Sequence, residues 1–133
     1  MYVVILGCGR VGARLAAMLD RDGHQVCVID KTLAAFDRLP AEYAGQVVLG
    51  EGVDVDILKQ AGIEKADAFC TLSDDDNINI MASQVAKRVF DVSRVITRIY
   101  DPSRQDTYKS LGLESICPTR IGVDRIEHLL GVR

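Results

Sequence analysis

The stretch Tyr2-Val3-Val4-Ile5-Leu6-Gly7-Cys8-Gly9-Arg10-Val11-Gly12 decides the fold of this chain. An apolar run leads into glycines with the spacing G-x-G-x-x-G, and an amphipathic segment follows from Arg10 to Asp22. This order predicts a strand, a tight turn and a helix, which is the context in which the glycine spacing indicates a nucleotide-binding turn. The alternative is a strand-to-helix turn that needs its glycines only for their backbone angles.

Each glycine of the turn has a separate expected role. Gly7 permits the sharp turn, Gly9 lets a pyrophosphate approach the backbone, and Gly12 lets the helix pack closely on the strand. The first N–H groups of the helix have no partner in the helix and carry the positive end of its dipole, so they favour an anion.

The composition is that of one globular domain. The chain has 133 residues, 48% of them hydrophobic, and a net charge of −3. Its lysines and arginines are scattered, which argues against a nucleic-acid partner because such partners select a basic face. No apolar run approaches the ~20 residues of a membrane span. The sequence starts directly with the first strand, so we expect no signal peptide.

The four cysteines do not have the spacing of a metal site. Cys8, Cys27, Cys70 and Cys117 form no C-x-x-C pair, and neither histidine lies near them at ligand spacing. Those after Cys8 lie in predicted strands, where a free thiol is a small buried hydrophobe, as expected in a reducing cytoplasm. Cys8 lies beside a helix N-terminus that lowers thiol pKa values; the alternative is a variable position of the turn.

The rest of the chain repeats a strand-helix unit. Alternation between strands and helices predicts an α/β domain with a doubly wound parallel sheet of the Rossmann type, in strand order 3-2-1-4-5-6. We expect a single domain over residues 1–133. The predicted strands cover residues 2–6, 25–29, 46–49, 68–72, 94–99 and 114–117, and the predicted helices cover 10–22, 31–39, 54–61, 77–90, 102–111 and 119–130.

Asp30 is the candidate ribose ligand. It ends the second predicted strand, at about the distance beyond Gly12 at which dinucleotide-binding domains carry a ribose-binding carboxylate. A carboxylate repels a 2′-phosphate, so NAD is favoured over NADP, and ATP, ADP and AMP fit equally well because they share this ribose. The alternative is a turn residue at a strand end.

Further polar residues follow the other strands, where ligands bind in open α/β sheets. Glu51 meets adenine or ribose, or is a solvated turn carboxylate. Ser73 and Asp74 line the far half of the pocket, cap the next helix, or do both. Arg98 pairs with Asp74 or with a ligand phosphate, or makes only a surface ion pair.

Arg10 lies inside the glycine turn, one residue into the helix. Its side chain reaches outward, toward a terminal phosphate or a neighbouring subunit, or it is a solvated residue of the first turn. Proton transfer needs a positioned acid or base, but His24 lies at the far end of the first predicted helix and His128 in the last, and no nucleophile-base pair is suggested. A nucleotide pocket without such groups indicates a sensor.

Taken together, these segments resemble the N-terminal domain of regulators of K⁺ conductance, the RCK or KTN domain of Trk- and Ktr-type K⁺ transport systems. The resemblance covers nearly the whole chain, and its later segments are more specific than the glycine turn. The matching segments are Val4–Gly12, Val28–Asp30, Gly50–Asp54, Ala66–Ala68, Leu72–Ile80, Ile96–Pro102, Leu111–Leu113 and Cys117-Pro118.

The resemblance implies a cytoplasmic regulatory domain, at the inner face of the membrane, that binds NAD(H), ATP, ADP or AMP and catalyses nothing. It implies homodimers that assemble into a tetrameric or octameric ring on a membrane-embedded K⁺ transporter or channel subunit. The candidate cofactor-binding residues are Gly7, Cys8, Gly9, Arg10, Val11, Gly12, Asp30, Lys31, Glu51, Ser73, Asp74 and Arg98.

The last predicted helix, residues 119–130, is the expected dimerisation element. Val123, Ile126, Leu129 and Leu130 form an apolar stripe that a lone domain leaves partly uncovered. Two other functions stay open: the cofactor-binding fragment of an NAD-dependent oxidoreductase, and an interaction domain whose cleft binds nothing.

Two residues depart from the family pattern. Glu51 replaces the usual Asp, which bears on the ligand contact and on the choice of ligand. Thr119 stands where some members carry an acidic residue that helps to bind a divalent cation, so we expect no metal site.

Overall fold

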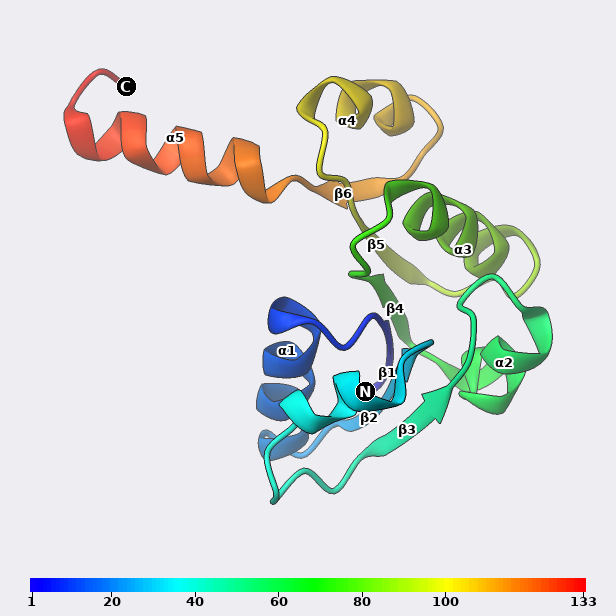
Figure 1. The fold of residues 1–133 in the computed structure, drawn as a ribbon. Helices are drawn as coiled ribbons and strands as arrows, with labels where there is room; N and C mark the ends of the chain where they lie inside the picture. The colour runs from blue at the N-terminus through cyan, green and yellow to red at the C-terminus, as the bar shows by residue number, and fades with distance from the viewer.

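The computed structural model describes residues 1–133 and forms a three-layer α/β domain (Figure 1). Its strands are β1 (Tyr2–Leu6), β2 (Gln25–Asp30), β3 (Gln46–Leu49), β4 (Ala68–Thr71), β5 (Arg94–Arg98) and β6 (Glu114–Ile116). Its α-helices are α1 (Arg10–Arg21), α2 (Val55–Gln60), α3 (Asp76–Arg88), α4 (Pro102–Lys109) and α5 (Pro118–Leu130). Two short 3₁₀-helices are η1 (Leu33–Arg38) and η2 (Ile63–Lys65).

The six strands form one parallel sheet in the order β3-β2-β1-β4-β5-β6, which confirms the predicted topology. The order reverses between β1 and β4, where Leu6 lies opposite Thr71. The turn after β1 and the loop after β4 therefore lie next to each other at the carboxyl edge of the sheet, the place where such sheets bind ligands.

Strand alternation divides the apolar core between the two faces of the sheet. Val4 and Leu6 of β1 pack with residues of α2 and α3, whereas Val3 and Ile5 pack with residues of α1 and η1. Successive side chains of a strand point to opposite faces, so a nearly continuous apolar strand is what a sheet covered on both faces requires.

A buried polar network attaches α3 to the sheet. The Ser83 hydroxyl of α3 lies 3.0 Å from the Thr71 hydroxyl of β4 and accepts a hydrogen bond of 2.7 Å from the Thr97 hydroxyl of β5. All three residues are fully buried, so these bonds satisfy hydroxyl groups that would otherwise destabilise the core.

Two elements differ from the prediction. The segment predicted as a helix over residues 31–39 is the 3₁₀-helix η1, because Pro40 ends it before an α-helix can propagate. The short η2 after Gly62 was not predicted. Other boundaries agree to within about two residues, the usual uncertainty of helix ends.

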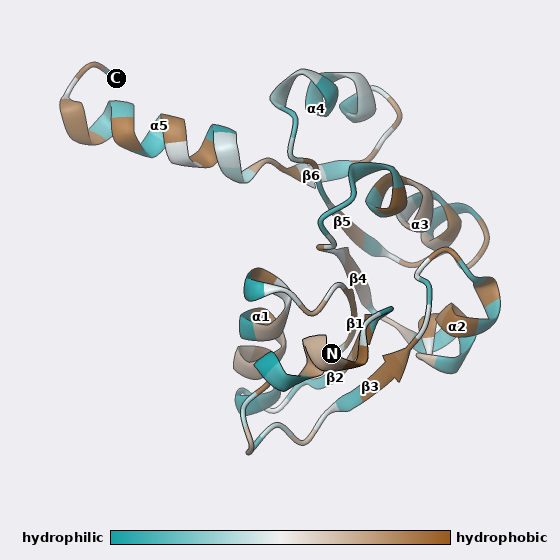
Figure 2. Ribbon diagram, viewed as in Figure 1, coloured by the Kyte–Doolittle hydropathy of each residue, from teal (hydrophilic) through white to brown (hydrophobic).

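The helix α5 extends away from the sheet (Figure 1), and no residue of it is buried. Apolar residues recur along its length (Figure 2). The predicted stripe is exposed at Val123 (51%), Ile126 (58%), Leu129 (68%) and Leu130 (72%), which confirms that the lone chain leaves it uncovered. None of the helices is both long and apolar enough to span a membrane.

Candidate functional site

The glycine turn between β1 and α1 is shaped by two close backbone approaches. Gly7 has a φ of +104°, and a Cβ atom there would lie 2.7 Å from the Ser73 nitrogen. A Cβ atom at Gly12 would lie 1.8 Å from the Gly7 carbonyl oxygen, so only glycine allows α1 to start this close to β1. This confirms the packing role predicted for Gly12.

Gly9 has the opposite surroundings, because a Cβ atom there would meet no atom within 4 Å. Gly9 is the N-cap of α1 and provides no side-chain cap, and the first backbone bond of the helix runs from the Ala13 N–H to its carbonyl at 2.9 Å. The N–H groups of Arg10 and Val11 are therefore free of helix partners. Open space next to unpaired N–H groups is the geometry that an anion needs.

A cleft of about 900 Å³ lies at this edge of the sheet. Its volume is within the range of small-molecule sites. Every predicted cofactor-binding residue except Gly12 lines it, namely Gly7, Cys8, Gly9, Arg10, Val11, Asp30, Lys31, Glu51, Ser73, Asp74 and Arg98. Gly12 is buried behind the turn and acts on the cleft through its packing.

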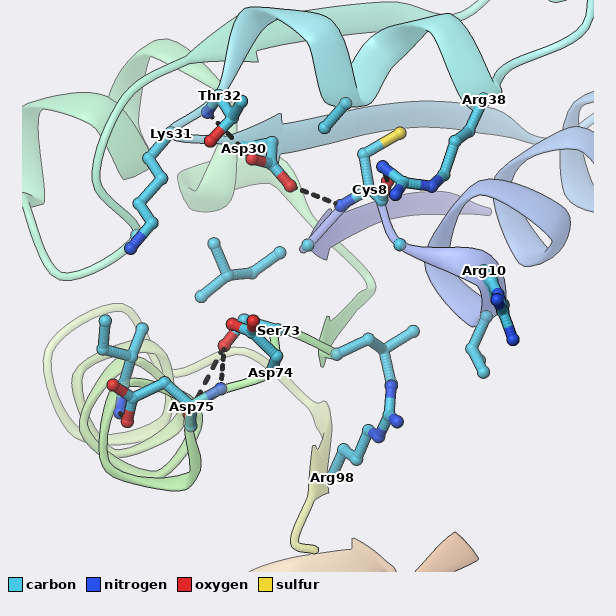
Figure 3. Close-up of a pocket in the computed structure, with 18 of the residues that line it drawn as sticks. Cys8, Arg10, Asp30, Lys31, Thr32, Arg38, Ser73, Asp74, Asp75 and Arg98 are labelled. Carbon is cyan, nitrogen blue, oxygen red and sulfur yellow. Dashed lines mark hydrogen bonds between the residues drawn. The ribbon is translucent and has the colours of Figure 1, made fainter.

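The Asp30 carboxylate connects the end of β2 to the glycine turn (Figure 3). Its Oδ2 accepts a hydrogen bond of 2.8 Å from the Cys8 N–H, and its Oδ1 accepts one of 2.9 Å from the Thr32 N–H. Asp30 is therefore both a turn residue and a half-buried carboxylate on the wall of the cleft. Each oxygen keeps further lone pairs for the hydroxyl groups of a ligand.

Of the two interpretations of Cys8, the one with a lowered thiol pKa is not supported. Burial raises the pKa of its thiol, and the nearby Asp30 carboxylate raises it further, while Arg38 lowers it in part. The Cys8 side chain is fully buried in the core between α1 and the sheet. Desolvation disfavours the thiolate there, so Cys8 is a packing residue of the turn.

The far wall of the cleft is the loop between β4 and α3, and a neighbouring asparagine shapes it. The buried Asn79 accepts hydrogen bonds from the Ser73 N–H at 3.0 Å and the Ser73 hydroxyl at 2.6 Å. It donates to the carbonyl oxygens of Ser73 at 2.9 Å and Arg98 at 3.1 Å. Asn79 thus fixes the loop and joins it to the end of β5.

Of the two roles considered for Ser73 and Asp74, lining the cleft is confirmed and capping α3 is not. The N-cap is Asp75, whose Oδ1 accepts hydrogen bonds from the N–H groups of Asn77 and Ile78, and neither Ser73 nor Asp74 caps the helix. Asp75 has extended backbone angles directly before α3, whereas the Ser73 hydroxyl donates to Asn79. Asp74 is left exposed on the cleft.

Of the alternatives for Arg98, neither the pairing with Asp74 nor a surface ion pair is present. The guanidinium carbon of Arg98 lies 4.1 Å from the centroid of the Tyr100 ring, a cation–π contact. Its Nε is buried without a hydrogen-bond partner. Both residues line the cleft, so the far wall carries a stacked cation with unused donor capacity.

Three cations at the cleft rim differ in their contacts. The side chains of Arg10 and Lys31 are exposed and form no ion pair or hydrogen bond, and they lie on different sides of the glycine turn (Figure 3). Arg38 folds back from η1 and donates a long hydrogen bond of 3.4 Å to the Cys8 carbonyl. The exposed Glu51 lies on the same rim and likewise has no partner.

Sequence reasoning missed several cleft residues, chiefly Thr32, Arg38, Asp75, Ile78 and Tyr100. Tyr100 lies two positions beyond Arg98, the last residue of β5, so the same search of strand ends would have found it. Arg38 carries no comparable signal, because only the fold of η1 brings it over the turn. Among the acidic, histidine and cysteine side chains, no group of three or more is arranged to hold a metal ion.

The sequence matches the TrkA-N domain family over residues 3–118. A Trk system potassium uptake protein TrkA from Streptomyces coelicolor is 45% identical over 126 residues, which make up 95% of this chain and 56% of that protein. The chain thus spans little more than half the length of this relative.

Solved structures agree with the fold. The TrkA-N domain of the inner membrane protein YbaL from Escherichia coli superposes with a TM-score of 0.85 at 20% identity, over 97% of this chain and 96% of that one. The GsuK channel bound to NAD superposes with a TM-score of 0.81 at 25% identity, over 98% of this chain and 23% of that one. GsuK bound to ADP gives a TM-score of 0.80 at the same identity, over 97% and 33%.

Proposed function

The chain belongs to the TrkA-N domain family, and from that premise we propose that it senses adenine nucleotides and regulates a K⁺ transporter or channel. The observation that carries the proposal is the glycine turn, where unpaired N–H groups of α1 face an open cleft with Asp30 on its wall. The family regulates K⁺ uptake and is not an enzyme family, so the alternative of an oxidoreductase fragment is not supported.

The near half of the cleft suits the adenosine and pyrophosphate of NAD(H), ATP or ADP. The N–H groups of Arg10 and Val11 would receive phosphate oxygens, and Asp30 would accept hydrogen bonds from the ribose hydroxyls. Lys31 and Glu51 stand on the rim beside the ribose. GsuK, a structural relative, has been solved with NAD and with ADP, and AMP would use the same ribose contact.

The far half suits the part of the ligand that differs among these nucleotides. Ser73, Asp74 and the Arg98–Tyr100 stack lie opposite the glycine turn. Arg10 has no partner within the chain, so it is free to meet a terminal phosphate or a neighbouring subunit. We therefore assign discrimination among nucleotides to Arg10 and Arg98.

The exposed stripe of α5 supports a homodimer. Residues of α5 contact no core of their own chain, and burying each such side chain stabilises an assembly by about 1.5–3 kcal/mol. Such dimers would form a tetrameric or octameric ring on a membrane-embedded K⁺ transport subunit, at the inner face of the cell membrane. Ligands that favour different dimer geometries would then alter ion flux, through their differential affinity for the two states.

Calorimetric titration with NAD, NADH, ATP, ADP and AMP tests the proposal directly. We expect at least one of them to bind the purified chain with saturation, and Asp30→Asn to weaken every binder by about 10- to 100-fold, since hydrogen bonds to a charged group are lost. Glu42→Gln, the same charge change at an exposed position outside the cleft, is the control. Absence of binding by all five nucleotides would overturn the proposal in favour of an interaction domain.

Arg10→Ala tests discrimination in the same titrations. We expect it to reduce the preference of the chain among ATP, ADP and NADH by about tenfold, the value of one charge-assisted contact, while AMP binding changes little. Equal losses for all nucleotides would remove Arg10 from this role.

A further inference from the structure

Tyr100 occupies a junction between the cleft and the base of α5. Tyr100 lines the cleft and its ring stacks with the Arg98 guanidinium, while its backbone groups are bonded to two other elements. It directly follows Ile99, which is fully buried and whose N–H donates to the Ile116 carbonyl of β6 at 2.9 Å. The backbone at Tyr100 is therefore attached to neighbouring elements and does not lie in a loose loop.

On one side, Asp76 clamps Tyr100 to the start of α3. Its Oδ1 accepts a hydrogen bond of 2.8 Å from the Tyr100 N–H, and its Oδ2 accepts a longer one of 3.4 Å from the Asp101 N–H. Arg104 of α4 lies 3.7 Å from the same carboxylate, whose side chain is only 10% exposed. Asp76 is the first residue of α3, directly after the cleft loop, and it does not line the cleft itself.

On the other side, the Tyr100 carbonyl is bonded to the N-cap of α5. The buried Cys117 thiol donates to it at 3.6 Å. Arg120, in the first turn of α5, donates to the Pro102 carbonyl at 3.0 Å and pairs with Asp106 at 3.2 Å, so α4 also holds the base of this helix. Beyond this base no residue of α5 is buried.

Because α5 is bonded at its base and none of its residues is buried, a small rotation at the base displaces the far end of the helix. A helix of its 13 residues is about 20 Å long, so a rotation of about 5° at the base moves the far end by about 2 Å. Tyr100 therefore connects the cleft wall to the base of α5. The Arg98 Nε on that wall is buried without a hydrogen-bond partner, so a ligand that offers an acceptor would favour a rearrangement of the wall.

We propose that Asp76 and Tyr100 couple the occupant of the cleft to the direction of α5. Asp76 is the positioning residue, because it holds Tyr100 between the cleft and the base of α5. The inference rests on the proposed function, because it presumes a nucleotide in the cleft. It adds a path from the cleft to the proposed dimer helix, through the Asp76 carboxylate, the Tyr100 backbone and the Cys117 thiol.

Spin-label distance measurements test the path. Labels at Arg125→Cys on α5 and Lys59→Cys on α2 report the direction of α5 relative to the sheet. Both positions are exposed and all four native thiols are buried, so the labels attach selectively to the new cysteines. Labelled chain is diluted with unlabelled chain so that only distances within one protomer contribute. Calorimetry with NAD and with ATP on the same samples measures binding separately.

We expect a bound nucleotide to shift the label distance by about 2 Å or more in the otherwise native chain, and Asp76→Ala to remove more than half of this shift while the dissociation constant changes less than about threefold. Asp76→Asn keeps one carbonyl acceptor for the Tyr100 N–H, so it should restore most of the shift. Circular dichroism confirms that both variants are folded.

The outcomes separate the two proposals. Absence of binding to the native chain overturns the proposed function and this inference with it. Binding without a shift, or an equal shift in Asp76→Ala, overturns the inference alone and leaves the nucleotide site in place.

Discussion

The two walls of the cleft lie at the same edge of one sheet but are held in different ways. The glycine turn is shaped by backbone approaching backbone, as Gly12 against the Gly7 carbonyl shows. The opposite wall is shaped by side chains: Asn79 fixes Ser73, and Tyr100 carries Arg98. Backbone contact leaves no room for a side chain at Gly7 or Gly12, whereas the second wall contains a buried Arg98 Nε that has no hydrogen-bond partner. We therefore expect the backbone of the first wall to bind any adenine nucleotide, and the Arg10 side chain and the second wall to respond to which one is bound.

The largest expected effect is at Gly12. Gly12→Ala would place a methyl group 1.8 Å from a backbone oxygen, so α1 must shift, and we expect the free energy of unfolding to fall by about 3 kcal/mol. Gly9→Ala places its methyl group in open space and should cost under about 1 kcal/mol, although it fills the proposed phosphate position. Urea denaturation measures both, and equal losses would contradict a backbone-shaped wall.

The matching change in the second wall is Asn79→Ala. It leaves the Ser73 and Arg98 carbonyl groups and the Ser73 N–H without their buried partner, and we expect a loss of about 2–3 kcal/mol. Asn77→Ala is the control on the same helix, because Asn77 is exposed and its side chain bonds only Arg104. If the Asn79 variant is as stable as this control, the network does not hold the wall.

The stability of the chain at alkaline pH tests how completely the sheet beneath both walls buries its thiols. Burial raises the pKa of Cys27 in β2 and of Cys70 in β4 to about 11, from an ordinary value of 9. Because the pKa is raised in the folded state, the protonated thiols contribute their full stabilisation of the fold below pH 9. This contribution to the free energy of unfolding, on the order of 2 kcal/mol for each thiol, is lost as the pH rises toward 11. Unfolding measured between pH 8 and 11 should show this fall, and Cys27→Ala or Cys70→Ala should each remove part of the slope; a flat profile in the unmodified chain would contradict it.

The strands and most helices were predictable because their signals are local. Apolar runs, helical spacing and glycine or proline stops follow from the pleat and pitch of the backbone, and the carboxyl-end rule then selected eleven of the residues that line the cleft. The misses have one cause in common. The pKa of Cys8 depends on burial and on Asp30, and the contacts of Ser73 and Arg98 depend on Asn79 and Tyr100, which the local sequence pattern does not reveal.

By itself, the sequence determined the strand-turn-helix start, the strand order and the set of polar residues at the sheet edge, because spacing along one chain encodes them. Only the tertiary structure decided how these residues are used. It buries Cys8, assigns the helix cap to Asp75, stacks Arg98 on Tyr100 and leaves α5 uncovered, because each of these outcomes depends on which groups arrive from distant parts of the chain and how much water they exclude.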